Sequence, residues 1–244
     1  MVVQPTVELA KRWSVQRLAP TIAETPILKD KVSDPKSRDS GNTQLVKEFK
    51  GGIIVATGAN SAVGLRSMPC RYLMLDEVDA YPLDADGEGD PVSLAIKRTA
   101  TFSRKKILEI STPTIKGISR IEREYNQSDA RRYFVPCPHC KAEQFLKWSG
   151  IVWDKDEDGN HLPETAKYEC ESCGEHIAEH HKGEMLANGR WIATNTTNNP
   201  KNAGFHLNCL YSPAGWKSWE ECVREFLESK EDKFMLKTWT NTVL

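Results

Sequence analysis

Short apolar runs that end in polar residues set the pattern of the first half of the chain. Tyr72–Leu75 is one such run, and it ends in Asp76 and Glu77; a second stretch, Ile107–Ile110, ends in hydroxyl residues. A continuous apolar run of this length is typical of a strand buried on both faces of a parallel sheet. We predict strands at both places and a further strand over Ile53–Ala56.

Two helices are predicted around these strands. Asp90 and Pro91 have the residue types of an N-cap and a first helical turn, which predicts a helix that runs through Lys97. This helix joins the two apolar runs into a right-handed βαβ unit. Near the N-terminus, helical spacing predicts a helix over 7–19 that Pro20 ends. Residues 30–44 are polar and rich in helix breakers, so we expect a surface loop there.

The carboxylates after the first run are candidate catalytic residues. In nucleotide hydrolysis, Asp76 would hold Mg²⁺ and Glu77 would orient the attacking water toward the γ-phosphate. An acidic turn that caps an ordinary core strand explains the same residues. The pattern is therefore a Walker B candidate with a structural alternative.

Hydroxyl residues follow the second strand. Because the carboxyl ends of parallel strands meet at one edge of the sheet, Ser111, Thr112 and Thr114 are expected beside Asp76 and Glu77. Hydroxyl groups at this edge can sense whether a γ-phosphate is present. We therefore predict a phosphate-sensing and coupling segment over residues 111–114.

Four of the seven cysteines form two CxxC pairs, Cys137 with Cys140 and Cys170 with Cys173. Each CxxC turn presents two thiolates to one ion, and two such turns complete a tetrahedral Zn²⁺ shell. The 29 residues between the pairs exceed the usual spacing, and a polar hairpin accounts for the excess. We predict a structural zinc ribbon, with two reduced thiol pairs in a small β module as the alternative.

The C-terminal part of the chain is predicted to be mainly helical. Helices are expected over 179–188, from the capping box of Ser218 and Glu221 to about Ser229, and again around Phe234 and Trp239. We predict that the aromatic residues of these helices belong to a core rather than to a base-stacking platform.

The motifs in their order resemble one protein family. They are QPT at 4–6, LDEVDAYP at 75–82, GEGDP at 87–91, STPT at 111–114, PCPHC at 136–140 and NTVL at 241–244. This combination resembles the GpA-type large terminase subunit of tailed bacteriophages and covers nearly the whole chain. The resemblance implies an ATPase that drives double-stranded DNA into the capsid, followed by a nuclease that cuts the DNA concatemer.

One motif of that family is missing from the sequence. A Walker A loop needs GxxxxGK[ST], and no such motif occurs in the 244 residues. In the family this loop lies upstream of QPT, and the nuclease is expected after NTVL. We therefore expect the chain to be the central part of a larger protein and to be inactive alone as an ATPase.

The charge distribution adds candidate contacts to phosphate. The net charge is −1, but from Lys97 to Lys147 there are 12 Lys and Arg against 5 Asp and Glu, an excess of 12 − 5 = 7 positive charges. Such a segment either contacts phosphates or is a solvated charged face. We single out Arg66, Arg131 and Arg132 as possible phosphate or DNA contacts.

The sequence thus predicts an α/β fold: a mostly parallel sheet of the P-loop NTPase type, with a zinc ribbon inserted or appended. We expect the C-terminal part of the ATPase core over 1–133, the ribbon over 134–178, and a helical and β segment over 179–244. The expected cofactors are ATP, Mg²⁺ and Zn²⁺. A non-catalytic zinc-ribbon module that binds DNA or protein is the alternative.

The partners and the location are expected as follows. The resemblance implies a terminase small subunit, a capsid portal and an oligomeric motor in the host cytoplasm. No membrane is expected, because no apolar run approaches the roughly 18 residues that span a bilayer. The N-terminus also lacks the pattern of a signal peptide.

Overall fold

The chain divides into two compact units. The computed structural model describes residues 1–32, 41–66, 68–197 and 199–244. The first unit comprises Met1–Pro113 with Ser119–Ile121, and the second comprises Thr114–Ile118 with Glu122–Leu244. The domain limits expected at residues 133 and 178 stay predictions. Most of the loop expected over 30–44 falls on residues 33–40, which lie outside the described residues.

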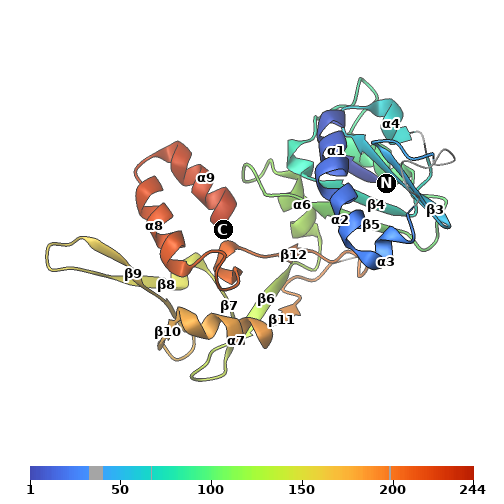
Figure 1. Ribbon diagram of the computed structural model, residues 1–244. Helices are drawn as coiled ribbons and strands as arrows, with labels where there is room; N and C mark the ends of the chain where they lie inside the picture. The colour runs from blue at the N-terminus through green and yellow to red at the C-terminus, as the bar shows by residue number, and fades with distance from the viewer. Residues whose placement is uncertain (33–40, 67, 198) are drawn as a thin grey trace. The chain divides into compact units, whose positions relative to one another are not determined.

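A five-stranded sheet organises the first unit (Figure 1). Its order is β2-β3-β1-β4-β5, and β3, β1, β4 and β5 run parallel while β2 pairs antiparallel with β3. The strands are β1 Val2–Gln4, β2 Val46–Phe49, β3 Gly52–Gly58, β4 Tyr72–Asp76 and β5 Lys106–Ile110. The three predicted strands and the parallel βαβ unit are confirmed, so the carboxyl ends of β1, β4 and β5 share one edge.

The first unit contains five complete α-helices and the start of a sixth among the described residues. They are α1 Val7–Trp13, α2 Ala19–Glu24, α3 Pro26–Lys29, α4 Ala62–Arg66 and α5 Pro91–Lys97, and α6 Arg120–Gln127 starts in this unit. The side chain of Asp90 accepts a hydrogen bond from the N–H of Ser93, and this N-cap confirms the predicted start of α5.

The N-terminal helix does not end at Pro20, so that prediction is wrong. A π-helical segment, Ser14–Leu18, follows α1, and α2 continues to Glu24. In the π segment the N–H of Ala19 bonds to the carbonyl of Ser14, five residues back. This shift changes the backbone hydrogen-bond pattern of the helix next to Pro20, which has no N–H to donate. Pro20 is the second residue of α2, and proline is well tolerated in the first turn of a helix.

Strand β4 is buried on one face rather than on both, which corrects the expectation from its apolar run. Leu73 and Leu75 are fully buried and pack with residues of α4 and α5, whereas Tyr72 and Met74 are half exposed. Helix α1 packs mainly on β1 and β3. The apolar run therefore marks a sheet with one covered face and one open apolar face at this end.

Two small sheets form the β part of the second unit. One has the order β10-β9-β8, and the other has the order β11-β6-β12 with β7 paired to β6. The strands are β6 Arg131–Pro136, β7 Glu143–Phe145, β8 Ile151–Lys155, β9 His161–Glu169, β10 His176–Ala178, β11 Arg190–Ile192 and β12 Phe205–His206. The β8–β9 hairpin lies between the two CxxC pairs, as predicted for the long spacing.

Helix α7 Lys182–Ala187 packs on β6, α8 Trp219–Ser229 packs on β9, and α9 Lys233–Val243 packs on α8. The capping box of Ser218 and Glu221 is present at the start of α8. Trp239 is buried in the core of this unit and Phe226 packs against it, so the core prediction is confirmed for both. Phe234 is exposed, and the prediction is wrong there because Phe234 lies in the first turn of α9 at a solvent-facing position.

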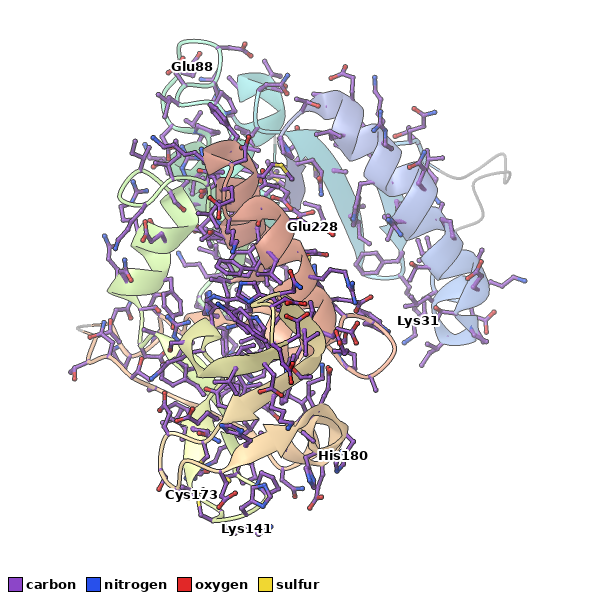
Figure 2. All side chains as sticks on the ribbon, turned by 90° about the vertical axis from the view of Figure 1, so that its left-hand side faces the viewer. Lys31, Glu88, Lys141, Cys173, His180 and Glu228 are labelled. Carbon is purple, nitrogen blue, oxygen red and sulfur yellow. The ribbon has the colours of Figure 1, made fainter. Side chains whose placement is uncertain are left out.

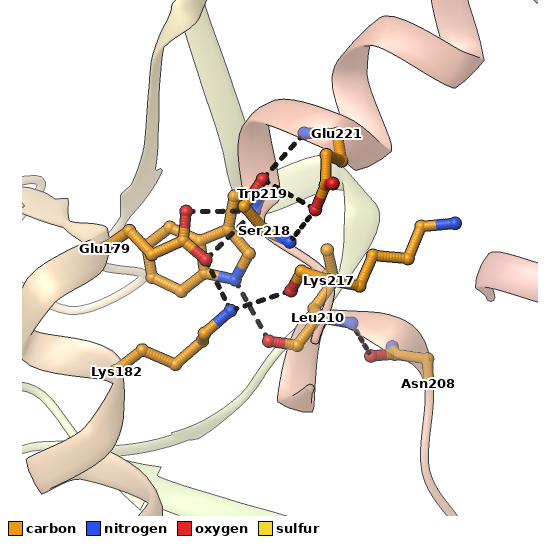
Figure 3. A network of polar contacts seen from close by, with 8 residues as sticks. All are labelled: Glu179, Lys182, Asn208, Leu210, Lys217, Ser218, Trp219 and Glu221. Atoms are coloured by element: carbon orange, nitrogen blue, oxygen red, sulfur yellow. Dashed lines mark hydrogen bonds and ion pairs between the residues drawn. The ribbon is translucent and has the colours of Figure 1, made fainter. Parts of the chain in front are cut away.

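A buried polar network fixes the start of α8 (Figure 3). The side chain of Lys182 is 3% exposed, pairs with the carboxylate of Glu179 and donates to the carbonyl of Lys217 at 3.2 Å. The same carboxylate accepts from the backbone N–H of Trp219 at 3.0 Å, and the Trp219 indole donates to the carbonyl of Leu210. The start of α7, the loop at Lys217 and the start of α8 are thereby joined through satisfied buried groups.

Candidate active site and metal centre

Asp76 is held by a side chain from the neighbouring strand. It is the last residue of β4, and its Oδ2 accepts a hydrogen bond from Nε2 of Gln4 at 2.8 Å. Gln4 is the last residue of β1 and is only 6% exposed. Because an amide can donate without adding charge, Gln4 fixes one carboxylate oxygen and keeps the negative charge of Asp76 available to a cation.

Glu77 has a backbone conformation that is unusual for its type. Its φ is 56°, in the left-handed region, which costs a residue with a Cβ on the order of 1 kcal/mol or more. Burial raises the pKa of its carboxyl, and the charges of Asp76 and Asp79 raise that pKa further. A hydrogen bond with Ser111 acts in the opposite direction. A strained carboxylate with a raised pKa has the properties of a general base.

Ser111 connects Glu77 to the start of α6. Its hydroxyl is a hydrogen-bond partner of Glu77 and also accepts from the backbone N–H of Asp79 at 3.2 Å. The carboxylate of Asp79 accepts from the N–H of Ile121, in the first turn of α6, at 2.8 Å. The structure therefore brings Ser111 to Glu77 at the carboxyl edge of the sheet, where the parallel strands place it.

The other predicted coupling residues lie farther along the same segment. Thr112 is exposed, and its carbonyl accepts a hydrogen bond from the hydroxyl of Ser111. Thr114 belongs to the second unit, where its carbonyl accepts from the side chain of Asn241 at 2.9 Å. Within the predicted segment, Ser111 contacts the carboxylate site.

The three arginines singled out from the sequence already have partners in the protein. Arg66 and Arg131 form ion pairs at 3.0 and 2.8 Å, and the guanidinium of Arg132 lies over an aromatic ring, 5.3 Å from its centroid. Their partners are Glu88, Asp129 and Tyr125, in that order. These contacts orient all three side chains, and a phosphate role for them stays a prediction.

The four cysteines converge on one point. Their Sγ atoms all lie within 4.8 Å of one another, with 4.0 Å between Cys137 and Cys173 and 3.8 Å between Cys140 and Cys170. A tetrahedral shell with Zn–S bonds of about 2.3 Å requires sulfur atoms about 3.8 Å apart. The donor set and its spacing therefore fit Zn²⁺. Cys173 and Lys141 lie close together at this end of the unit (Figure 2).

The two CxxC turns have the same backbone design. In each, the N–H four residues after the first cysteine bonds to that cysteine's carbonyl, from Lys141 to Cys137 and from Gly174 to Cys170. Both donor residues have positive φ, 65° and 72°. The N–H of Ala142 lowers the pKa of Cys140 to about 7, whereas burial raises the pKa of Cys137. Four thiolates so close together require a cation.

Three polar residues near the carboxylates were not identified from the sequence as site residues. Gln4 is a buried polar residue at the end of an apolar strand, and this pattern is a usable signal. Asp79 and Tyr81 follow Glu77 at short spacing. The hydroxyl of Tyr81 donates to the carbonyl of Val3 at 2.8 Å, and burial, followed by the charge of Asp76, raises its pKa.

Comparison with known proteins assigns the chain. Residues 1–191 match the family model described as "Phage terminase large subunit gpA, ATPase domain". This chain belongs to the gpA family of phage terminase large subunits. Residues 202–244 match a second gpA model, described as the terminase large subunit endonuclease domain. The expectation that the nuclease begins only after residues 241–244 is therefore wrong.

Two curated relatives of this gpA-family chain carry the same printed name, "Terminase, large subunit". The one from Enterobacteria phage P21 is 31% identical over 267 residues and covers 99% of this chain; that from Escherichia phage lambda is 28% identical over 264 residues and covers 98%. The chain spans about 40% of the length of each relative. No solved structure matches it.

One further class of function can be addressed from the helices. Outside residues 33–40, 67 and 198, no helix is both long and apolar enough to cross a membrane.

Proposed function

We propose that this chain is part of a DNA-packaging terminase whose ATPase uses Asp76 and Glu77. The observation that carries the proposal is the pair of carboxylates at the carboxyl end of β4, with Asp76 held by Gln4 at 2.8 Å, in a chain that matches the gpA ATPase model. Mg²⁺-ATP, when bound, supplies the phosphoryl group and the charge compensation for its transfer.

Each carboxylate has a distinct role in this proposal. Asp76, with its carboxylate oriented by Gln4, would hold Mg²⁺. Glu77 orients a water molecule and accepts its proton, and the raised pKa makes its carboxylate a stronger base. Ser111, which bonds to both Glu77 and Asp79, transmits the state of this site to α6. Thr112 and Thr114 continue the coupling segment.

The metal centre has a structural role in the proposal. Cys137, Cys140, Cys170 and Cys173 bind one Zn²⁺, and four thiolates leave no ligand position for a reacting water. The ion joins the turn after β6 to the turn after β9. The remaining parts of the motor, a phosphate-binding loop and the complete endonuclease, are expected from the rest of the parent protein, as are the small-subunit and portal partners.

The test is a substitution in the full-length parent protein. Glu77→Gln keeps the shape of the side chain but cannot accept a proton, so we expect hydrolysis to fall by about 10²-fold or more while Mg²⁺-ATP binding is retained. Asp76→Ala should instead weaken Mg²⁺-nucleotide binding. Thr112→Ala should leave hydrolysis measurable and stop DNA movement. If Glu77→Gln hydrolysed ATP at the wild-type rate, Asp76 and Glu77 would be only an acidic turn that caps the strand.

The rival is a zinc-ribbon module that binds DNA or protein without catalysis. The absence of GxxxxGK[ST] from the 244 residues favours it for this chain taken alone. The two proposals differ in a single pair of measurements on the full-length protein. The rival holds if Glu77→Gln changes neither hydrolysis nor packaging while Cys→Ser substitutions at the metal centre abolish the binding of DNA or of a partner protein.

A further inference from the structure

A second charged surface lies on the first unit, at the opposite end of the same strands that carry the carboxylates. Its six cations, here called the basic rim, are Arg71, Lys97, Arg98, Arg104, Lys105 and Lys106. Tyr72, the first residue of β4, pairs with Lys106, the first residue of β5. With a rise of about 3.3 Å per residue, the rim lies about 13 Å along β4 from Asp76.

Backbone contacts hold the two segments of the rim together. The N–H of Lys106 donates to the carbonyl of Arg71 at 3.1 Å, and Nε of Arg71 donates to the carbonyl of Arg104 at 2.9 Å. The N–H of Cys70 donates to the carbonyl of Arg98 at 3.0 Å. The clustering of charge is therefore built into the sheet and its loops and does not depend on side-chain mobility.

The rim has no internal compensation for its charge. The segments 66–72 and 97–108 contain seven Lys and Arg and no Asp or Glu, and the next acid is Glu109 on β5. Among the described residues, none of the six rim cations forms an ion pair with a carboxylate. Five of the six are exposed, and Nε of Arg98 is buried without a hydrogen-bond partner in the part of the chain that the structure describes.

We infer that the basic rim binds the phosphate backbone of duplex DNA without reading its sequence, an inference that rests on the proposed terminase function. The rim offers cations and the exposed hydroxyls of Thr101 and Ser103, which can all donate to phosphate oxygens. The rim has no carboxylate or amide to accept from base N–H groups, so its donors match only base acceptors such as those of guanine, whereas phosphate oxygens are present at every step of the duplex. An acidic polypeptide would likewise present N–H donors that the rim leaves unmatched.

This placement separates the two ligands on one sheet. The carboxyl ends of β1, β4 and β5 carry the nucleotide residues, while the amino ends of β4 and β5 contact DNA. Arg131 and Arg132, which belong to the second unit and have partners there, are not required for this contact.

The experiment measures binding of the 244-residue chain to a labelled duplex of random sequence, without nucleotide, over a series of salt concentrations. The variant combines Arg104→Gln, Lys105→Gln and Lys106→Gln. Each lost phosphate contact reduces the slope of log K against log salt by about 0.9, so we expect a slope shallower by about 2 to 3 and binding weaker by about 10-fold or more at low salt.

The control combines Lys11→Gln, Arg12→Gln and Lys29→Gln, which remove the same charge from exposed positions of the same unit. We expect its slope to equal that of the unsubstituted chain, and thermal unfolding should show both variants folded. Equal slopes for the two variants, no duplex binding by the unsubstituted chain, or displacement of duplex by polyglutamate at equal charge would each overturn the inference. Because nucleotide is absent, none of these results depends on Glu77.

Discussion

The two units differ in how completely their own residues cover their apolar surface. In the second unit, Tyr168, Trp219 and Trp239 are buried in one core that also contains Cys137 and Cys170. In the first unit, Leu73 and Leu75 are equally buried, but the opposite face of the same strands is open. There Met74 is 48% exposed, and β5 forms the edge of the sheet.

The difference shows that a short apolar run can mark either a strand that is buried on both faces or a strand with one covered and one open face. An apolar sheet face and an unpaired edge strand are costly in water, and proteins normally cover or pair them. The open face of the first unit includes Leu108 and Ile110, which are also half exposed. We therefore expect the second unit to be stable by itself once its metal is bound, and the first unit to gain stability from further cover.

Removal of the metal is the change with the largest expected effect. Metal-linked folding contributes on the order of 10 kcal/mol in small zinc domains, so a strong chelator should release about one Zn²⁺ per chain and unfold the two CxxC turns of the second unit. The first unit should keep its protection from hydrogen exchange, which provides an internal control. Elemental analysis that finds no metal in protein purified without chelator would contradict this prediction.

Shortening a side chain on the covered face of β4 should lower the stability of the first unit more than shortening one on the open face. Leu75→Ala removes a fully buried side chain and should lower the free energy of unfolding of the first unit by about 3 kcal/mol. Met74→Ala, one residue away, should lower it by less than about 1 kcal/mol, because its side chain is already half in water. Denaturant unfolding measures both, and equal losses would show that the second face is covered in solution.

The buried ion pair of the second unit should matter more than an exposed one. Lys182→Ala leaves the carboxylate of Glu179 without its cation and should cost about 2 kcal/mol, below the usual range for fully buried pairs because Glu179 is partly exposed. Lys182→Met removes the ammonium group, which lies 5.5 Å from the centroid of the Trp219 ring, but keeps a long buried apolar chain, so it should cost less. The matched control is Arg224→Ala, which breaks an exposed pair with Glu220 and should cost less than about 0.5 kcal/mol. If Arg224→Ala lowered the free energy of unfolding as much as Lys182→Ala, burial of the ion pair would not explain the effect.

The smallest expected effect concerns strain at the candidate active site. Glu77 has a φ of 56°, which glycine adopts without a steric penalty. The free energy of unfolding of Glu77→Gly should therefore exceed that of Glu77→Ala by about 1 kcal/mol, and its melting temperature should be higher. Alanine is the matched control, since it removes the carboxylate and keeps the Cβ. If the two variants unfold alike, the backbone of Glu77 is not strained in solution.

Patterns that depend on local chemistry were predictable. The N-cap of Asp90, the capping box of Ser218 and the hairpin between the cysteine pairs are each confirmed. Each rests on contacts between residues close in the chain, which a sequence displays directly. The same holds for the CxxC turns, whose spacing specifies two sulfur ligands per turn.

The arrangement at the carboxylates was predictable only in outline. Parallel strands must bring the residues that follow them to one edge, so the meeting of Ser111 with the carboxylates follows from the βαβ pattern. The role of Gln4 in holding Asp76 does not, since 72 positions separate the two residues and only the pairing of β1 with β4 joins them.

The sequence by itself determined the parallel strands, the cysteine ligand set and the family resemblance, because each depends on residue type at short spacing. The tertiary structure decided which face of β4 is covered, that the helix passes Pro20, and that the rim cations gather at one end of the sheet while Arg131 and Arg132 take internal partners. Burial and charge pairing are set by which distant segments come together, and hydrophobicity along the chain does not carry that information.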